Sequence, residues 1–194
     1  MRIAVMALQG AFIEHVQRLK ELGADTCEIR QLADWKQFLS ATDGGGRGLV
    51  LPGGESTVQA LLMQSLGLSV PLREAIVGGM PVFATCAGMI MLADTHLSTM
   101  QIRVRRNAFG RQLGSFRTTG TVEGIGTDIP MTFIRAPYIE EVNDTTMCQP
   151  LAHIEGHIVA ARQQWQLATA FHPELDADKR LHSYFMRMVG EAHY

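Results

Sequence analysis

The chain has 194 residues, of which 46% are hydrophobic and 19% charged, and its formal net charge is −2. This composition is that of a globular protein, and we expect a single domain over residues 1–194. The near-neutral charge gives no electrostatic reason to expect nucleic acid or a membrane surface as a partner. Three cysteines argue against a disulfide framework and for a reducing compartment, which predicts a cytoplasmic protein.

The first half of the chain alternates apolar runs with segments of helical periodicity. Arg2–Leu8 is an apolar run too short for a signal peptide or a membrane span, and it predicts a buried strand. Further strands are expected over Thr26–Arg30, Gly48–Leu51 and Pro81–Thr85, and helices over residues 12–22, 34–40, 56–66 and 70–77. This alternation indicates βαβ units and a parallel sheet.

The second half of the chain favours antiparallel strands. Gln101–Arg106 alternates at period two, which predicts a strand added to the parallel core. The remaining expected elements are a strand over Met131–Ile134, a hairpin of Ala152–Ile154 and His157–Ala161, a core strand over Leu167–Phe171 and a final helix over Lys179–Val189. The predicted fold class is therefore α/β, with a mostly parallel central sheet and added antiparallel strands.

Cys86 stands between the strand Pro81–Thr85 and an apolar helix that begins at Ala87. A sharp turn from strand to helix exposes a nucleophile at the carboxyl edge of a sheet, and a helix N-terminus favours a reactive thiol. The N–H of Ala87 would also face an oxyanion on an attacked carbonyl. The alternative is a small buried hydrophobic cysteine, and Ala84 stands where the usual elbow motif has its first glycine.

A loop with two adjacent glycines follows the expected third strand. Gly53 and Gly54 are expected to adopt positive φ and to present N–H groups to an oxyanion, while Ser56 or Thr57 caps the next helix. The alternative is a simple tight turn. Because loops at the carboxyl ends of neighbouring parallel strands share one crevice, we expect this loop to meet Cys86.

A histidine and an acid follow the last expected core strand. In an extended segment residues two apart point the same way, so His172 is expected to be a base that the carboxylate of Glu174 orients. With Cys86 they form the nucleophile, base and acid of an acyl-transfer site. The sequence has no H-E-x-x-H or C-x-x-C pattern, and we expect neither a metal nor a cofactor.

Four arginines make residues 103–111 the most basic segment: Arg103, Arg105, Arg106 and Arg111. Alternating arginines more often belong to a solvated strand face. The alternative is a site for the carboxylate of a substrate.

Several strings in the sequence resemble a known family. They are Leu8-Gln9-Gly10-Ala11-Phe12 with Glu14-His15, Leu51–Thr57, Thr85–Gly88, Arg106–Gln112, Phe133–Pro137 and Phe171–Leu175. The cysteine, histidine and glutamate strings are typical of class I glutamine amidotransferases. The other strings are similar to those of the glutaminase subunits of pyridoxal 5′-phosphate synthases, the PdxT family. The resemblance covers nearly the whole chain.

The resemblance implies a three-layer, flavodoxin-like fold and hydrolysis of L-glutamine to L-glutamate and ammonia. The ammonia would pass to a (β/α)8-barrel synthase subunit that makes pyridoxal 5′-phosphate, which is a product and not a cofactor. By motif, Cys86 is the nucleophile, His172 the base and Glu174 its charge partner. The implied glutamine-binding residues are Gly54, Glu55, Ser56, Arg106, Ile134 and Arg135, and the implied oxyanion residues are Gly53, Gly54 and Ala87.

The resemblance also implies that docking on the synthase activates the glutaminase, with an activation or interface role for Gln9, Gly10 and His15. Two alternatives stay open. One is another amidotransferase glutaminase or a free-standing γ-glutamyl hydrolase on the same fold. The other is a thiol sensor or partner-binding module, against which the string Phe171–Glu174 argues because a sensor needs no base and acid there.

Overall fold

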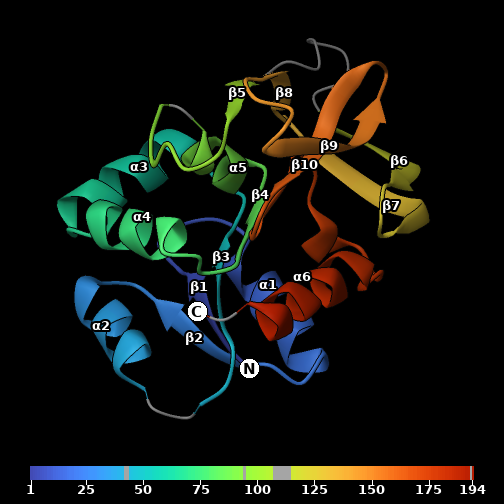
Figure 1. The fold of residues 1–194 in the computed structure, drawn as a ribbon. Helices are drawn as coiled ribbons and strands as arrows, with labels where there is room; N and C mark the ends of the chain where they lie inside the picture. The colour runs from blue at the N-terminus through green and yellow to red at the C-terminus, as the bar shows by residue number, and fades with distance from the viewer. Residues whose placement is uncertain (42–43, 94, 107–114, 193) are drawn as a thin grey trace.

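A mixed sheet runs through the middle of the molecule, with helices on both faces (Figure 1). The structure is a computed structural model that describes residues 1–41, 44–93, 95–106, 115–192 and 194. The strand order is β2-β1-β3-β4-β11-β10-β8-β5, and β9 also pairs with β10. The parallel strands are β1 (Arg2–Met6), β2 (Asp25–Ile29), β3 (Arg47–Leu51), β4 (Val82–Thr85) and β11 (Gln166–Thr169). The antiparallel strands are β5 (Ile102–Arg105), β8 (Tyr138–Val142), β9 (Cys148–Ile154) and β10 (His157–Gln163).

The helices form two layers around this sheet. Figure 1 shows α3, α4 and α5 on one face and α1 and α6 on the other. Their bounds, with that of the short 3₁₀ helix η1, are α1 (Phe12–Glu21), α2 (Leu32–Ser40), α3 (Ser56–Ser65), α4 (Ser69–Val77), α5 (Ala87–Leu92), η1 (Pro173–Leu175) and α6 (Arg180–Glu191). The predicted α/β class, with a mostly parallel sheet and added antiparallel strands, is confirmed.

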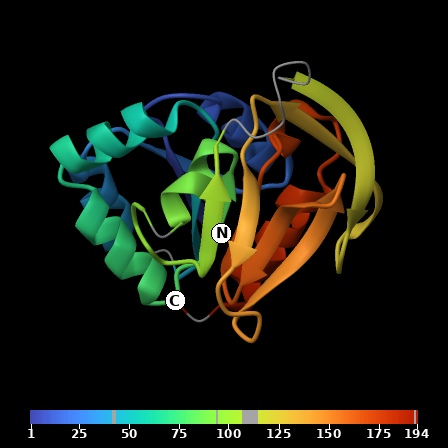
Figure 2. The same ribbon diagram turned by 90° about the horizontal axis from the view of Figure 1, so that it is seen from above.

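Two antiparallel strands form a separate small sheet, β6 (Ser115–Val122) and β7 (Gly126–Ile134). Figure 2 shows this ribbon on the side of the molecule opposite α3 and α4. Thr132 of β7 fastens it to the turn after β11, because its carbonyl accepts the N–H of His172 at 2.8 Å and its hydroxyl donates to Asp176. The ribbon is thereby held beside the carboxyl end of β11.

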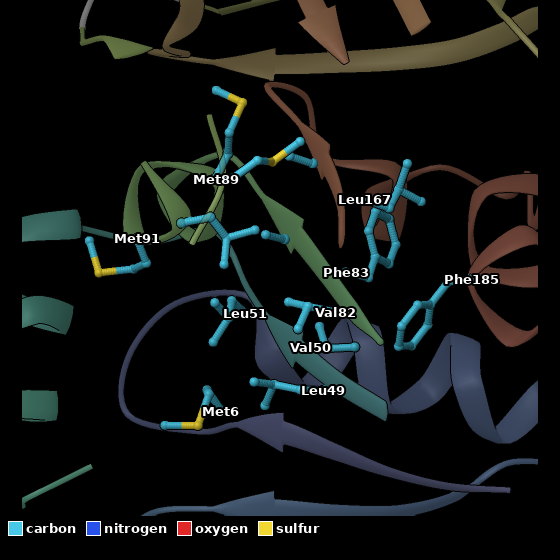
Figure 3. Packing of buried hydrophobic residues seen from close by; sticks show 14 of the residues in the cluster. Met6, Leu49, Val50, Leu51, Val82, Phe83, Met89, Met91, Leu167 and Phe185 are labelled. Carbon is cyan, nitrogen blue, oxygen red and sulfur yellow. The ribbon is translucent and has the colours of Figure 1, made fainter. Parts of the chain in front are cut away.

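The core lies on both faces of the parallel strands, as expected for strands that are apolar along their whole length. Figure 3 shows Val82 and Leu51 among the packed strand residues, with Met91 of α5 on one side and Phe185 of α6 on the other. All four side chains are buried. Within the described part of the chain no single helix is long and apolar enough to cross a bilayer, whereas α3 and α4, bent by 99°, pass that test only as a pair.

Candidate active site

The carboxyl ends of β1, β3, β4 and β11 meet at one edge of the sheet, where a pocket of about 440 Å³ opens. Parallel strands bring such loops together even when they are far apart in the sequence. The pocket is lined by Gln9, Gly54, Glu55, Ser56, Cys86, Ala87, Ile90, Arg106, Ile134, Arg135, Pro137 and His172. The expected meeting of the double-glycine loop with Cys86 is therefore observed.

Cys86 occupies the turn between β4 and α5 with φ 48° and ψ −103°. Non-glycine residues rarely adopt positive φ, so the turn holds its cysteine in a strained conformation. Its N–H donates to the carbonyl of Thr169 on β11 at 2.7 Å, which fixes the turn to the neighbouring strand. Two residues later a side chain at Gly88 would put its Cβ 1.9 Å from the carbonyl oxygen of Leu51, so only glycine lets α5 begin here. This is the geometry of a nucleophile elbow.

His172 lies between Cys86 and Glu174. Its Nδ1 is 2.7 Å from Oε1 of Glu174, and the Cys86 side chain lies near enough to the ring to affect its pKa. Because Nδ1 is taken by the carboxylate, Nε2 is the nitrogen left for the sulfur. The backbone differs from the sequence expectation: Pro173–Leu175 is a 3₁₀ turn and not an extended segment. This turn of helix brings the side chains of His172 and Glu174 together.

The charge on His172 is set by opposing influences. Burial lowers the pKa of this imidazole, but the hydrogen bonds and negative charges of Cys86 and Glu174 outweigh it and raise the pKa to about 10. At neutral pH His172 is therefore protonated. A cysteine sulfur beside an imidazolium is in the environment of thiolate nucleophiles.

The loop Gly53–Gly54 uses its glycines differently from the expectation. Neither glycine has positive φ. A Cβ on Gly53 would lie 2.3 Å from the ring of His172, and one on Gly54 would lie 2.4 Å from Oε1 of Gln9, so close packing excludes side chains. The N–H of Gly53 donates to the hydroxyl of Thr85 at 3.0 Å, so it already has an acceptor, and the expected oxyanion role of Gly53 stays a prediction. Gly54 and Ala87 line the pocket; Ala87 is the first residue of α5, so its N–H lacks an intrahelical partner.

Glu55 is the N-cap of α3, a role that the sequence reasoning gave to Ser56 or Thr57. Its carboxylate accepts the N–H groups of Val58 at 2.7 Å and Thr57 at 3.1 Å. These bonds lower the pKa of the Glu55 carboxyl. Ser56 is buried in the first turn, and both Glu55 and Ser56 line the pocket.

Of the clustered arginines, Arg106 lines the pocket. Its guanidinium donates to the hydroxyl of Thr57 at 3.3 Å and lies 3.1 Å from Nε2 of His96. Arg103 and Arg105 instead pair with glutamates of β8 on an exposed strand face, as expected for a solvated face. Arg111 and the string after Arg106 lie outside the described residues.

Ile134 and Arg135 reach the pocket from the end of β7. Arg135 has φ 42°, so the chain turns sharply where the ribbon meets the site. These two residues, which are expected to bind glutamine, thus stand at the end of the small separate sheet, whereas Cys86 and His172 follow β4 and β11 of the main one.

The three residues with an expected activation or interface role lie in different places. Gln9 lines the pocket, and its side-chain oxygen accepts the N–H of Glu55 at 2.7 Å. Gly10 packs against Gly53 with φ 98°. His15 is 0% exposed and lies beneath the surface, which does not fit direct contact with a partner, and its expected activation role stays a prediction.

Several residues of the site were missed from the sequence. Ile90 and Pro137 line the pocket, His96 contacts Arg106, and Thr85 binds the Gly53 loop. Ile90 could have been found, because position i+4 on a helix shares the face of Cys86. Within the described residues, no group of three or more His, Cys, Asp and Glu side chains is placed to hold a metal ion.

A cysteine elbow with a histidine and a glutamate, on a doubly wound sheet, is the arrangement of a glutamine amidotransferase of class I. The model of the SNO glutamine amidotransferase family matches residues 5–191. A pyridoxal 5′-phosphate synthase subunit PdxT of Streptococcus pneumoniae (strain CGSP14) is 47% identical over 198 residues, which cover 98% of each chain. The chain belongs to the SNO glutamine amidotransferase family, a family of enzymes, and the resemblance seen in the sequence is confirmed.

Solved structures agree with this assignment. A crystal structure of a glutamine amidotransferase has a TM-score of 0.85 and 37% identity, covering 97% of this chain and 98% of that one. The structure of PurLQS from Thermotoga maritima has a TM-score of 0.63 at 11% identity, covering 96% and 97%. The second likeness is one of fold alone.

Proposed function

We propose that the single domain of residues 1–194 hydrolyses L-glutamine to L-glutamate and ammonia through Cys86, His172 and Glu174, and delivers the ammonia to a pyridoxal 5′-phosphate synthase. The observation that carries this proposal is that Cys86 and His172 line one pocket together with Arg106, while Nδ1 of His172 is 2.7 Å from Oε1 of Glu174. Family membership supports glutamine as the substrate.

In the proposed acylation, the sulfur of Cys86 attacks the side-chain amide carbon of glutamine. A tetrahedral oxyanion forms, and the N–H groups of Ala87 and Gly54 are the candidates to bind it. The proton on His172 then goes to the departing nitrogen, which leaves as ammonia, and a γ-glutamyl thioester stays on Cys86. The raised pKa of His172 supports this step, because the proton is already in place.

In the proposed deacylation, His172 has lost its proton and acts as a base. It removes a proton from water, and the resulting hydroxide attacks the thioester carbon. The bond between the carbon and the sulfur breaks, glutamate leaves, and the Cys86 sulfur is released as thiolate beside His172, which keeps the proton that it took from water. Glu174 holds the ring through Nδ1 in both steps, so Nε2 stays turned to the reacting atoms. These steps use side chains, backbone and water, and we propose that no cofactor or metal takes part.

The remaining pocket residues are proposed to hold glutamine. Arg106 is placed to pair with the α-carboxylate, and its contacts with Thr57 and His96 limit the positions of the guanidinium. Glu55, Ser56, Ile134 and Arg135 complete the wall of the pocket. Two walls from different sheets thus enclose one amino acid.

We also propose that the partner is a barrel-shaped synthase subunit; the name of the PdxT relative, a subunit of pyridoxal 5′-phosphate synthase, supports a synthase as the partner. Ammonia is lost to solvent unless it passes directly to an acceptor, so a glutaminase of this kind works in a complex. We propose that Gln9 takes part in activation by the synthase, because it lines the pocket and accepts the N–H of Glu55. Three free cysteines fit a reducing compartment, and we place the protein in the cytoplasm.

The decisive experiment is a glutaminase assay of wild type and Cys86→Ala, each with and without the synthase subunit. The expected result is hydrolysis by wild type that the synthase stimulates, no hydrolysis by Cys86→Ala, and a glutamyl adduct on Cys86 detected by mass spectrometry during turnover. Hydrolysis by Cys86→Ala would contradict the proposed nucleophile. Full wild-type activity without any partner would favour a free-standing γ-glutamyl hydrolase.

A further inference from the structure

Two buried histidines lie directly behind Glu174. His15 of α1 and His182 of α6 are both 0% exposed, and their rings meet with Nδ1 of His15 3.0 Å from Nε2 of His182. They come from opposite ends of the chain, 167 residues apart. A buried pair of polar rings is costly unless its hydrogen bonds are made, so the pair calls for an explanation.

Burial keeps both rings neutral. It lowers the pKa of His182 to about 3, with a further decrease from the charge of Arg18 and an opposing increase from Glu21. Burial also lowers the pKa of His15 well below its ordinary value, with smaller decreases from His182 and His172. Each ring therefore carries one proton at neutral pH, and the question is which nitrogen holds it.

The hydrogen-bond pattern assigns the protons. Nδ1 of His182 is buried and no described residue bonds it. A buried N–H without an acceptor is rarer in proteins than an acceptor left unused, so the proton of His182 belongs on Nε2 and is donated to Nδ1 of His15. The proton of His15 is then on Nε2, on the side that faces Thr85 and Glu174.

The N–H at Nε2 of His15 lies near a carboxylate oxygen that has no other donor among the described residues. Oε1 of Glu174 binds His172, whereas Oε2 is buried and has no hydrogen bond from the described residues. Nε2 of His15 lies 3.3 Å from Oε2 and 3.1 Å from the hydroxyl oxygen of Thr85. A small turn of the ring shifts its N–H from the hydroxyl to the carboxylate, which is the stronger acceptor.

We propose that His15 is a positioning residue of the catalytic site: its Nε2–H, directed by His182, holds the oxygen of Glu174 that His172 does not use. A carboxylate fixed at both oxygens cannot rotate away from the imidazole, so His172 keeps one orientation through both steps. The inference rests on the proposed triad. It explains a fully buried histidine that an interface role does not fit.

The test compares three substitutions of His15 in the complex with the synthase subunit. His15→Gln puts an amide N–H near the position of Nε2, His15→Asn reaches only the position of Nδ1, and His15→Leu has no donor. The expected kcat of His15→Gln is within about threefold of wild type, while His15→Asn and His15→Leu lose about tenfold or more, as for loss of one bond to a charged group. The KM for glutamine is expected to change less than about twofold, because His15 does not line the pocket.

A second measurement separates positioning from folding. The rate of alkylation of Cys86 by iodoacetamide, resolved by peptide mass spectrometry against pH, follows the Cys86–His172 pair without turnover. His15→Asn is expected to shift this profile and His15→Gln to keep it, with both variants folded by circular dichroism. Equal behaviour of Gln and Asn variants, or a wild-type kcat in His15→Leu, would overturn the inference. If Cys86→Ala stayed active, the triad itself would be wrong; an inactive Cys86→Ala beside an unaffected His15→Asn would refute the positioning role alone.

Discussion

At the scale of single residues, function depends on where one proton and one positive charge lie. The pKa of His172 is raised to about 10 because Cys86 and Glu174 favour its charged form more than burial opposes it. The positive charge of Arg106 lines the pocket, whereas its neighbours Arg103 and Arg105 face solvent in ion pairs. The proton predicts how kcat/KM changes with pH, and the positive charge predicts how KM changes when Arg106 is replaced.

The proton on His172 predicts the alkaline limit of activity. The proton is needed by the departing ammonia, and it is lost as pH rises through the pKa. We expect kcat/KM for glutamine to stay level above about pH 7 and to fall as pH approaches about 10. The measurement is kcat/KM across this range with circular dichroism to confirm the fold. A decline centred near pH 7 would show that the resting imidazole is neutral.

Arg106→Met should raise the KM for glutamine about tenfold or more, because a charge-assisted contact with the substrate carboxylate is lost. Arg103→Met is the matched control, because it makes the same change on the exposed face of β5, where Arg103 pairs with Glu140 and Glu141. The control is expected to change KM less than about twofold and stability by less than about 1 kcal/mol. Equal effects of the two substitutions on KM would remove Arg106 from the binding site.

At the scale of elements, the elbow depends on how closely α5 approaches β3. Gly88→Ala would place a Cβ 1.9 Å from the carbonyl oxygen of Leu51, so the helix must move away from the strand. We expect a loss of about 3 kcal/mol in the free energy of unfolding. Gly45→Ala, whose Cβ would lie 3.6 Å from the backbone of Met1, should change it by less than about 0.5 kcal/mol. Urea denaturation of both variants checks this, and a stable Gly88→Ala would mean that α5 tolerates displacement.

Elements with a strong local signal were predicted from the sequence, and those without one were not. The apolar run before Cys86 predicted β4. The turn at Gly156 predicted the hairpin of β9 and β10. β8 was missed because Tyr138–Val142 contains two consecutive glutamates and only Ile139 is buried. Its place in the sheet depends on pairing with β5, which no local pattern encodes.

The residues of the proposed triad carry a local signal in the sequence, while the residues that contact them from behind do not. Cys86, His172 and Glu174 stand in short strings with a chemical pattern. The contact between His15 and His182 joins two helices 167 residues apart, and periodicity marks each as an ordinary buried position. The same holds for Thr85, a strand residue whose hydroxyl binds the Gly53 loop only after β3 and β4 have paired.

At the scale of the whole molecule, the buried histidine pair links stability to pH. The folded chain holds His182 with a pKa of about 3, below its ordinary value of 6.5, so the unfolded chain takes up the proton first. The resulting stability is present above about pH 6.5 and is lost as pH falls toward about 3.

We therefore expect the wild type to lose about 1.4 kcal/mol more per pH unit, between about pH 6 and pH 4, than His182→Gln, which keeps a donor for His15 but does not titrate. Urea denaturation of both proteins at several pH values measures the difference in slope. Parallel pH profiles would show that His182 is solvated or already charged in the folded state.

The positive φ of Cys86 implies a conflict between durability and activity at a single position. Any side chain there holds the backbone in a conformation that costs about 1–3 kcal/mol. Two inactive variants isolate this cost: Cys86→Gly should be more stable toward urea than Cys86→Ala by about 1 kcal/mol or more. Equal stabilities would mean that the turn is relaxed. If the difference is found, selection for thermal stability alone would tend to remove the nucleophile, and only the need for its chemistry keeps a side chain at that turn.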